Sequence, residues 1–119
     1  MAKHFEFGKQ AEEAACKYLM KKEYNIRERN YYFGKAEIDI IAENDDYIVC
    51  VEVKARSSSY FGNPQEFVTR KKVQQLVKAM HEYMQTKEVD KEVRFDIIAV
   101  MKNKEKLAIE HLENAFYHF

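Results

Sequence analysis

The sequence is poor in residues that interrupt regular structure, with only three Gly and one Pro among its 119 residues. We therefore expect short connections between helices and strands, since Gly and Pro dominate turns and loops. Tryptophan is absent, and the only two cysteines, Cys16 and Cys50, lie far apart and outside any CxxC motif. Isolated cysteines of this kind are most often buried thiols, so we expect both to lie in the core.

A long apolar run is also missing. No segment approaches the roughly 18–20 apolar residues that cross a bilayer, and the N-terminal segment has no apolar stretch of the secretory-signal type. We therefore expect a cytoplasmic protein with no membrane-spanning segment. With 46% hydrophobic and 34% charged residues, the composition is that of a globular protein, and the length suits one domain over residues 1–119.

The sequence lacks net charge as well, because 20 Lys and Arg are matched by 20 Asp and Glu. A neutral chain is at first sight a poor partner for nucleic acid. The charges are unevenly distributed, however: residues 36–55 carry six acidic and one basic side chain, whereas residues 56–80 carry five basic and one acidic. An acidic block beside a basic segment suits a metal site within a phosphate-binding surface, and equally an acidic hairpin without function.

Hydrophobic periodicity predicts an α/β protein with its elements in the order α-β-β-β-α-β-β. The expected helices cover residues 5–22 and a segment that begins after Thr69 as N-cap, and the expected strands cover residues 25–32, 36–43, 47–55, 93–101 and 107–110. A meander followed by a crossover helix and another strand implies a mixed central sheet flanked by helices.

The hairpin between the second and third strands carries the residues with the clearest chemistry. An even-length loop pairs residues so that Asp39 lies opposite Glu52, and Glu37 lies opposite Lys54. Two opposed carboxylates, with Cβ atoms about 5 Å apart, repel each other unless a cation lies between them. Mg²⁺ or Mn²⁺, which prefer oxygen ligands, would relieve this repulsion.

Neighbouring groups complete this candidate metal site. The backbone carbonyl of Val53 is a further candidate ligand, and Lys54 is placed to orient or deprotonate an attacking water or to stabilise charge on a phosphate. Glu12 lies inside the apolar stripe of the first helix and supplies another carboxylate if that helix packs on the same sheet face. The alternatives are a plain cross-strand salt bridge between Glu37 and Lys54 and, for Glu12, a carboxylate held by a neighbouring group.

Several segments, in order along nearly the whole chain, resemble the YraN-like family. They are Gly8, Ala11 and Glu12, Asn30, the stretches AEIDIIA (36–42) and VEVKAR (51–56), Phe61, Gly62 and Pro64, Val68, Thr69 and Lys72, RFDIIAV (94–100), and NAF (114–116). The resemblance implies a restriction-endonuclease-like core of the PD-(D/E)XK type, similar to archaeal Holliday junction resolvases, in a family whose biological role is unassigned. Carried over residue by residue, the nuclease motif falls on Glu12, Asp39, Glu52 and Lys54. No proline precedes Asp39, so the first letter of that signature is absent here.

A second group of residues is placed to contact a nucleic-acid backbone. The second helix begins with Arg70, Lys71 and Lys72, whose charges oppose the helix macrodipole, so helix stability does not explain them. Phosphate groups would be bound both by these cations and by the free N–H groups at the helix start. Arg56 lies beside the candidate site, and Tyr60 could stack on a base. The alternatives are a solvated basic face and an aromatic side chain that plugs the core.

Two functions from different classes remain. The first is a Mg²⁺- or Mn²⁺-dependent nuclease that hydrolyses phosphodiester bonds in nucleic acid, DNA in preference to RNA, with branched or damaged structures as candidate substrates. The second is a nucleic-acid-binding module that keeps the fold without catalysis. The aromatic tail, residues 116–119, is either a homodimer contact or a segment that folds back on the core.

Overall fold

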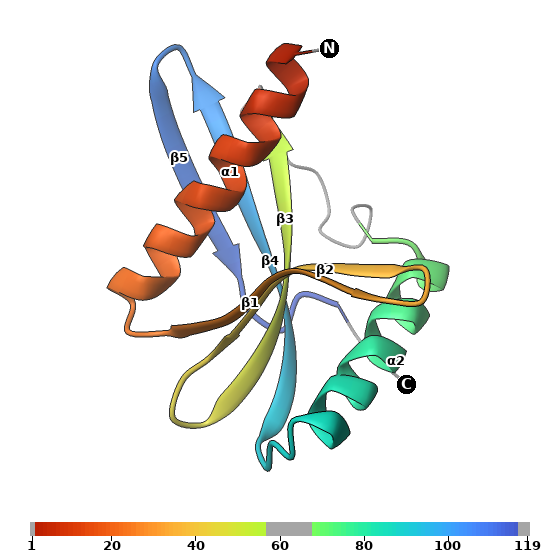
Figure 1. The fold of residues 1–119 in the computed structure, drawn as a ribbon. Helices are drawn as coiled ribbons and strands as arrows, with labels where there is room; N and C mark the ends of the chain where they lie inside the picture. Colours follow the sequence, from red (N-terminus) through yellow and green to blue (C-terminus); the bar gives the residue numbers. More distant parts are fainter. Residues whose placement is uncertain (1, 57–67, 117–119) are drawn as a thin grey trace.

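The computed structural model of the protein describes residues 2–56 and 68–116 (Figure 1). Within these residues the elements follow the predicted order. They are α1 (Ala2–Lys21), β1 (Asn25–Phe33), β2 (Ala36–Glu43), β3 (Tyr47–Arg56), α2 (Arg70–Thr86), β4 (Glu92–Asn103) and β5 (Lys106–Leu112). The first helix begins earlier than predicted. Strands β4 and β5 are also longer than predicted, because a tight turn at Lys104 (φ 58°) joins them directly.

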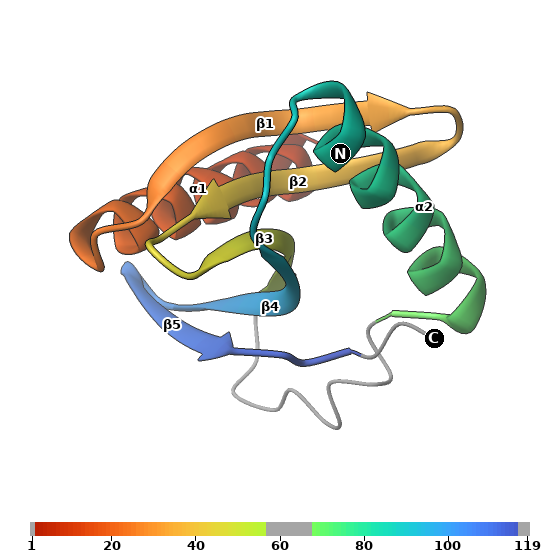
Figure 2. The ribbon, with the colours of Figure 1, turned by 90° about the horizontal axis from the view of Figure 1, so that it is seen from below.

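The strands form one mixed sheet in the order β1-β2-β3-β4-β5. All neighbouring pairs are antiparallel except β3 and β4, which are parallel because the chain between them returns through α2. Figures 1 and 2 show α1 along one side of the sheet and α2 beside the free end of the β1–β2 ribbon. This architecture confirms the predicted α/β class and is compatible with a restriction-endonuclease-like fold.

Two clusters of buried residues lie on opposite faces of the sheet, one with α1 and one with α2. The α1-side core consists of Ala11, Ala15, Cys16, Leu19, Ile40, Ala42, Val49, Val51, Ile98 and Val100. The α2-side core consists of Ala36, Ile38, Ile41, Ile48, Cys50, Val68, Val73, Leu76, Ala79, Met80, Tyr83, Phe95, Ile97 and Phe116. Both cysteines are buried free thiols, as predicted. Phe116 packs on Phe95, with ring centroids 5.3 Å apart, so the start of the aromatic tail folds back on the core.

Alternation along β3 assigns each side chain to a face. Val49 and Val51 lie in the α1-side core, whereas Cys50 lies in the α2-side core. Glu52 is two residues beyond Cys50 and therefore points to the α2 side as well. The first helix thus packs on the face opposite Glu52, which corrects the expectation that Glu12 approaches Glu52 across a shared sheet face.

The hairpin between β2 and β3 has the predicted register over only part of its length. The side chain of Asn44 accepts hydrogen bonds from the N–H groups of Asp46 and Tyr47, at 3.0 and 2.8 Å, which closes the turn. The ladder then runs over residues 40–43 and 48–51 and ends at the pair formed by Ile40 and Val51. The predicted pairing of residues 39 with 52 and 37 with 54 therefore lies beyond the ladder.

Past the end of this ladder, β2 continues only with β1. Glu37 is paired with Tyr32 of β1 and is exposed, and it accepts hydrogen bonds from Asn30 and Tyr32, so the predicted opposition of Glu37 and Lys54 is wrong. Two-stranded ribbons twist strongly, and here the twist carries the end of the ribbon toward α2. Ile38 consequently packs in the α2-side core although Ile40 packs in the α1-side core.

Candidate active site

A pocket of about 230 Å³ lies where β2 and β3 part. It is lined by residues of α1, β2, β3 and α2, namely Gly8, Ala11, Glu12, Asp39, Glu52, Val53, Lys54, Ala55 and Lys72. Since the two strands no longer pair there, side chains from both sides of the sheet reach the same space. The separation of two strands, and not a shared face, thus brings Glu12 to the carboxylates of Asp39 and Glu52.

The side chain of Asp39 replaces a backbone hydrogen bond between β2 and β3 beyond the end of their ladder. Its Oδ2 accepts a hydrogen bond of 2.8 Å from the N–H of Val53, which fixes the carboxyl group at the mouth of the gap. Burial, followed by the charge of Glu52 and a hydrogen bond to it, raises the pKa of Asp39 to about 8. Without a divalent ion, Asp39 is therefore protonated near pH 7.

We expect the free energy of unfolding of the metal-free protein to fall by on the order of 2 kcal/mol between about pH 6 and pH 9. Folded Asp39 keeps its proton up to a pKa of about 8, whereas the unfolded residue loses it near 3.8. The contribution of protonated Asp39 to the free energy of unfolding is thus fully present below the pKa of the unfolded residue and is lost as the pH rises through the pKa of the folded residue. Urea denaturation in EDTA at several pH values measures it. Asp39→Asn should show a shallower dependence, and equal slopes in the two proteins would contradict the assignment.

Glu52 is the most buried charged group of the pocket, with 2% of its side chain exposed. Its Oε2 forms ion pairs with the ammonium groups of Lys72 and Lys54, the latter at 3.7 Å. No described residue gives this oxygen a well-aligned hydrogen bond. Burial alone would lower the pKa of Lys72, but the contact with Glu52 and the charges of Asp39 and Glu37 raise it. The buried Oε2 of Glu52 is thus stabilised by the charges of two ammonium groups and not by an aligned hydrogen bond.

The remaining predicted ligands lie at the edge of the pocket. Glu12 accepts a hydrogen bond of 3.3 Å from Asn30 on β1, a residue in the left-handed region with φ 50°. The N–H and C=O of one residue leave a strand on the same side, so the carbonyl of Val53 faces the gap beside Asp39. Among residues 2–56 and 68–116, no group of three or more His, Cys, Asp or Glu side chains has metal-binding geometry. A metal here would be bound by two carboxylates, a carbonyl and waters or phosphate.

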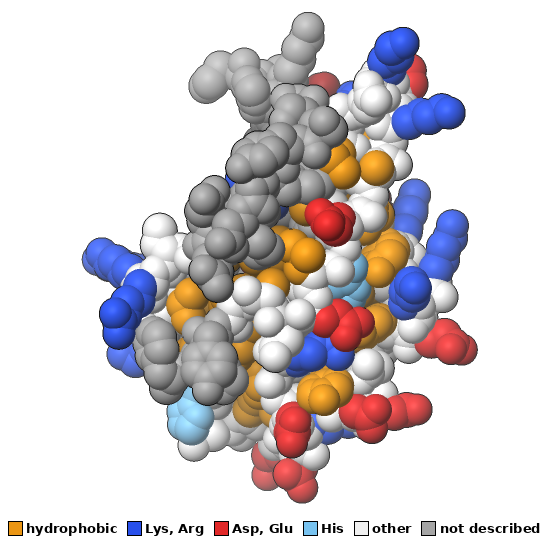
Figure 3. Space-filling model, turned by 180° about the vertical axis from the view of Figure 1, so that it is seen from behind, with side chains coloured by type: hydrophobic (Ala, Val, Ile, Leu, Met, Phe, Trp, Pro, Cys, Tyr) orange, Lys and Arg blue, Asp and Glu red, His pale blue; other side chains and the backbone are white. Residues whose placement is uncertain are grey.

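The predicted nucleic-acid-binding residues do not all meet. Lys72 lines the pocket, whereas Arg70 and Lys71 are exposed on the first turn of α2. Arg56 lies at the end of β3, where its Nη1 donates a hydrogen bond of 2.8 Å to the carbonyl of Ala55. Tyr60 lies outside the described residues. On the face seen in Figure 3, Lys and Arg side chains are dispersed around the rim and acidic side chains gather toward the lower end.

Sequence reasoning missed the place of Lys72 in the pocket. It grouped this residue with Arg70 and Lys71, because all three are cations at a helix start. The signal was present, since cations are unfavourable at that position unless a negative charge compensates them. Residue spacing could not show that the compensating charge is Glu52. Sequence reasoning also missed the role of Asn30, which was named only within the family resemblance. The side-chain amide of Asn30 donates hydrogen bonds to both Glu12 and Glu37.

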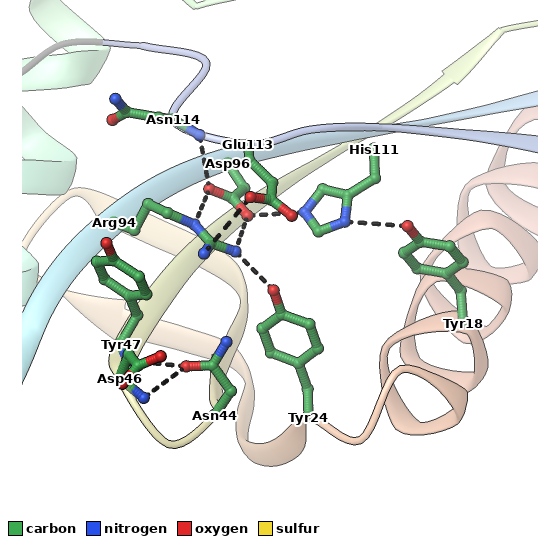
Figure 4. A network of polar contacts seen from close by, with 10 residues as sticks. All are labelled: Tyr18, Tyr24, Asn44, Asp46, Tyr47, Arg94, Asp96, His111, Glu113 and Asn114. Atoms are coloured by element: carbon green, nitrogen blue, oxygen red, sulfur yellow. Dashed lines mark hydrogen bonds and ion pairs between the residues drawn. The ribbon is translucent and has the colours of Figure 1, made fainter.

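A second polar cluster lies on the α1 side of the sheet (Figure 4). Asp96 is fully buried and accepts hydrogen bonds from Arg94 Nε and Nη2, at 2.9 and 2.8 Å, and from the N–H of Asn114 at 3.0 Å. Its Oδ2 also lies 2.7 Å from His111 Nε2. Although burial opposes ionisation, these contacts lower the pKa of Asp96. Arg94 and Asp96 thus form a buried ion pair.

This cluster ties the ends of the sheet to α1. Tyr18 Oη lies 3.1 Å from His111 Nδ1, and Arg94 Nη2 donates a hydrogen bond of 2.7 Å to Tyr24 Oη. Arg94 also lies over the ring of Tyr47, at 4.9 Å from its centroid. None of the residues that line the pocket belongs to this network, which links β4 and β5 to α1 and to the segment after it.

The fold and the pocket define a small α/β protein, compatible with the restriction-endonuclease-like class, in which two carboxylates and two lysines meet where β2 and β3 part. The chain belongs to the uncharacterised protein family UPF0102, whose model matches residues 11–100, and the resemblance to the YraN-like family is thereby confirmed. No helix of the described residues is long and apolar enough to cross a membrane.

Relatives match this chain over nearly all of its length. A UPF0102 protein of Christiangramia forsetii is 54% identical over 119 residues, which is 100% of both chains. One of Flavobacterium psychrophilum is 53% identical, again over 100% of both. A UPF0102 protein of Bacteroides thetaiotaomicron is 43% identical over 117 residues, 98% of this chain and 97% of that relative.

Proposed function

We propose that this protein is a Mg²⁺- or Mn²⁺-dependent nuclease that hydrolyses phosphodiester bonds in nucleic acid, DNA in preference to RNA. The observation that carries the proposal is the convergence of Asp39, Glu52, the Val53 backbone and Lys54 on one pocket. The pocket is large enough for an ion with several waters and one phosphate group, since a water takes about 30 Å³ in the liquid. The resemblance to PD-(D/E)XK nucleases supports the same reaction.

The donor set fits a hard divalent cation. Two carboxylates and a backbone carbonyl match the oxygen ligands of Mg²⁺ and Mn²⁺, which keep several waters in such sites. The residues that would hold it are Asp39, Glu52 and Val53, with Glu12 at the edge. Two features support this fit: Oε2 of Glu52 receives no well-aligned hydrogen bond, and burial together with the nearby charge of Glu52 raises the pKa of Asp39, a repulsion that a bound cation would relieve. When bound, the ion lowers the pKa of a water ligand and polarises the phosphate.

The chain supplies the remaining chemistry. Lys54, whose side chain is 21% exposed, can direct its ammonium group to the attacking water or to a phosphate oxygen on which charge develops. The hydrogen bond from Val53 holds the carboxyl group of Asp39 in one orientation. Asp39 therefore does not have to be ordered when the metal ion and substrate bind. With three carboxylates and two lysines in the pocket, a divalent ion and a monoanionic phosphodiester together give a neutral site.

We expect Mn²⁺ at a hundredfold excess over its Kd to stabilise the fold by about 2.7 kcal/mol, which raises the Tm on the order of 10 °C. At a fixed Mn²⁺ concentration the shift should grow with pH up to about pH 8, because the ion displaces the proton of Asp39 and its Kd therefore falls as the pH rises. Differential scanning calorimetry measures both effects.

End-labelled single-stranded, duplex and four-way-junction DNA, with RNA counterparts, should be cleaved with Mn²⁺ or Mg²⁺ and left intact in EDTA. Binding of these substrates without a metal shift or cleavage would favour a non-catalytic binding module.

A further inference from the structure

We propose that Lys72 is an internal cation of the metal-free site, which a divalent ion must displace from Glu52, and that the displaced ammonium group then binds a substrate phosphate. This inference rests on the proposed function and adds a regulation of the same site. Lys72 would make metal binding weak in the free protein and strong once nucleic acid can hold the ammonium group in its new place.

The first observation is the position of the ammonium group. Lys72 belongs to the first turn of α2, where its N–H donates a hydrogen bond of 3.1 Å to the N-cap hydroxyl of Thr69. From this anchored backbone its side chain reaches Oε2 of Glu52, the buried carboxylate oxygen without a hydrogen bond and therefore the one most open to a metal ion. Two cations cannot share one carboxylate oxygen at contact distance without strong repulsion. Metal binding and this ion pair therefore exclude each other.

The second observation decides which group moves. Glu52 cannot leave, because its side chain is 2% exposed in the middle of the sheet. Lys54 lies farther from Oε2, at 3.7 Å, and is 21% exposed. Lys72 is 40% exposed, and its flexible four-carbon stem can turn the ammonium group into solvent without moving the helix. Lys72 is therefore the cation that yields.

The third observation concerns the place to which the ammonium group would turn. The first turn of α2 contains no acidic residue, and Arg70 and Lys71 are exposed there. A displaced Lys72 would add a third positive charge to the positive end of the helix dipole, which is unfavourable until an anion binds. Phosphate groups bind at helix N-termini and to lysine side chains. A substrate phosphate would thus favour the displaced state and strengthen metal binding in the same step.

The first test is calorimetric titration of Mn²⁺ into wild type, Lys72→Met and Lys71→Met without nucleic acid. Lys71 is a matched control, since it lies on the same helix turn with the same charge but is exposed. Lys72→Met should bind Mn²⁺ about tenfold more tightly than wild type, and Lys71→Met about as wild type does. Lys72→Gln, which keeps hydrogen-bond donors for Glu52, should also bind more tightly and replaces the Met variant if that variant does not fold. Unchanged or weaker binding by Lys72→Met or its substitute overturns the proposal.

The second test measures the phosphate contact. In a Lys54→Ala background, which is expected not to cleave, fluorescence anisotropy gives the affinity for duplex DNA at saturating Mn²⁺. Adding Lys72→Met should weaken this affinity about tenfold and adding Lys71→Met clearly less, and equal losses would overturn the phosphate role. The outcomes also separate the two proposals: if wild type binds Mn²⁺ and Lys72→Met binds it no better, only the displacement is wrong. If neither protein binds Mn²⁺ with or without DNA, the proposed nuclease function fails with it.

Discussion

Asp39→Asn is expected to abolish metal-dependent cleavage and the metal-induced rise in Tm, while leaving the metal-free protein at least as stable as wild type. The amide keeps an oxygen for the N–H of Val53 and offers an N–H to Glu52, so the hydrogen bonds of the neutral carboxyl group are preserved. It cannot supply the negative charge that a divalent ion requires. We expect the cleavage rate to fall at least 10²–10³-fold, as for loss of a major electrostatic contact in an active site.

Lys54→Ala separates metal binding from chemistry. Because Lys54 acts on the water and the phosphate in the proposed mechanism, this variant should keep the metal-induced Tm shift but lose about 10²–10⁴-fold in single-turnover cleavage rate. The two readouts together distinguish a ligand from a catalytic lysine. A wild-type Tm shift that survives Asp39→Asn unchanged would show that the ion binds elsewhere.

Asp96→Ala is expected to destabilise the protein strongly, although Asp96 lies outside the pocket. Asp96 is fully buried, and its removal leaves the guanidinium group of Arg94, which is 10% exposed, without its bidentate partner. Breaking a buried ion pair in this way costs about 3–5 kcal/mol. Urea denaturation followed by circular dichroism measures the loss. The proposed nuclease residues are untouched, so folded Asp96→Ala at low temperature should still bind Mn²⁺.

The same guanidinium group provides the control. The carboxylate of Glu113 lies 3.7 Å from Arg94 Nη1, but its side chain is 60% exposed. Glu113→Gln should therefore change the free energy of unfolding by less than about 1 kcal/mol. Similar losses from Asp96→Ala and Glu113→Gln would mean that the buried network does not hold the sheet to α1.

The order of elements and the faces of β3 could be predicted from the sequence because both depend on local spacing. Val49 and Val51 alternate with Cys50, and an even-length turn at Asn44 sets the register of the hairpin. The same register places Asp39 and Glu52 just past the end of the ladder, although the ladder stops at Ile40 and the two residues do not form a cross-strand pair. Local periodicity carries this information, since each residue of a strand points to the side opposite its neighbours.

The sequence by itself thus determined the α/β order, the register of the central hairpin and the identity of the carboxylates and lysine at its end. Only the tertiary structure decided that β2 and β3 part beyond Ile40, because the twist of the β1–β2 ribbon depends on packing against α2. That separation brings Glu12 from the opposite face, lets Asp39 take the N–H of Val53 and places Lys72 against Glu52. The pocket is lined by residues up to 60 positions apart, Glu12 and Lys72, and no local pattern encodes their proximity.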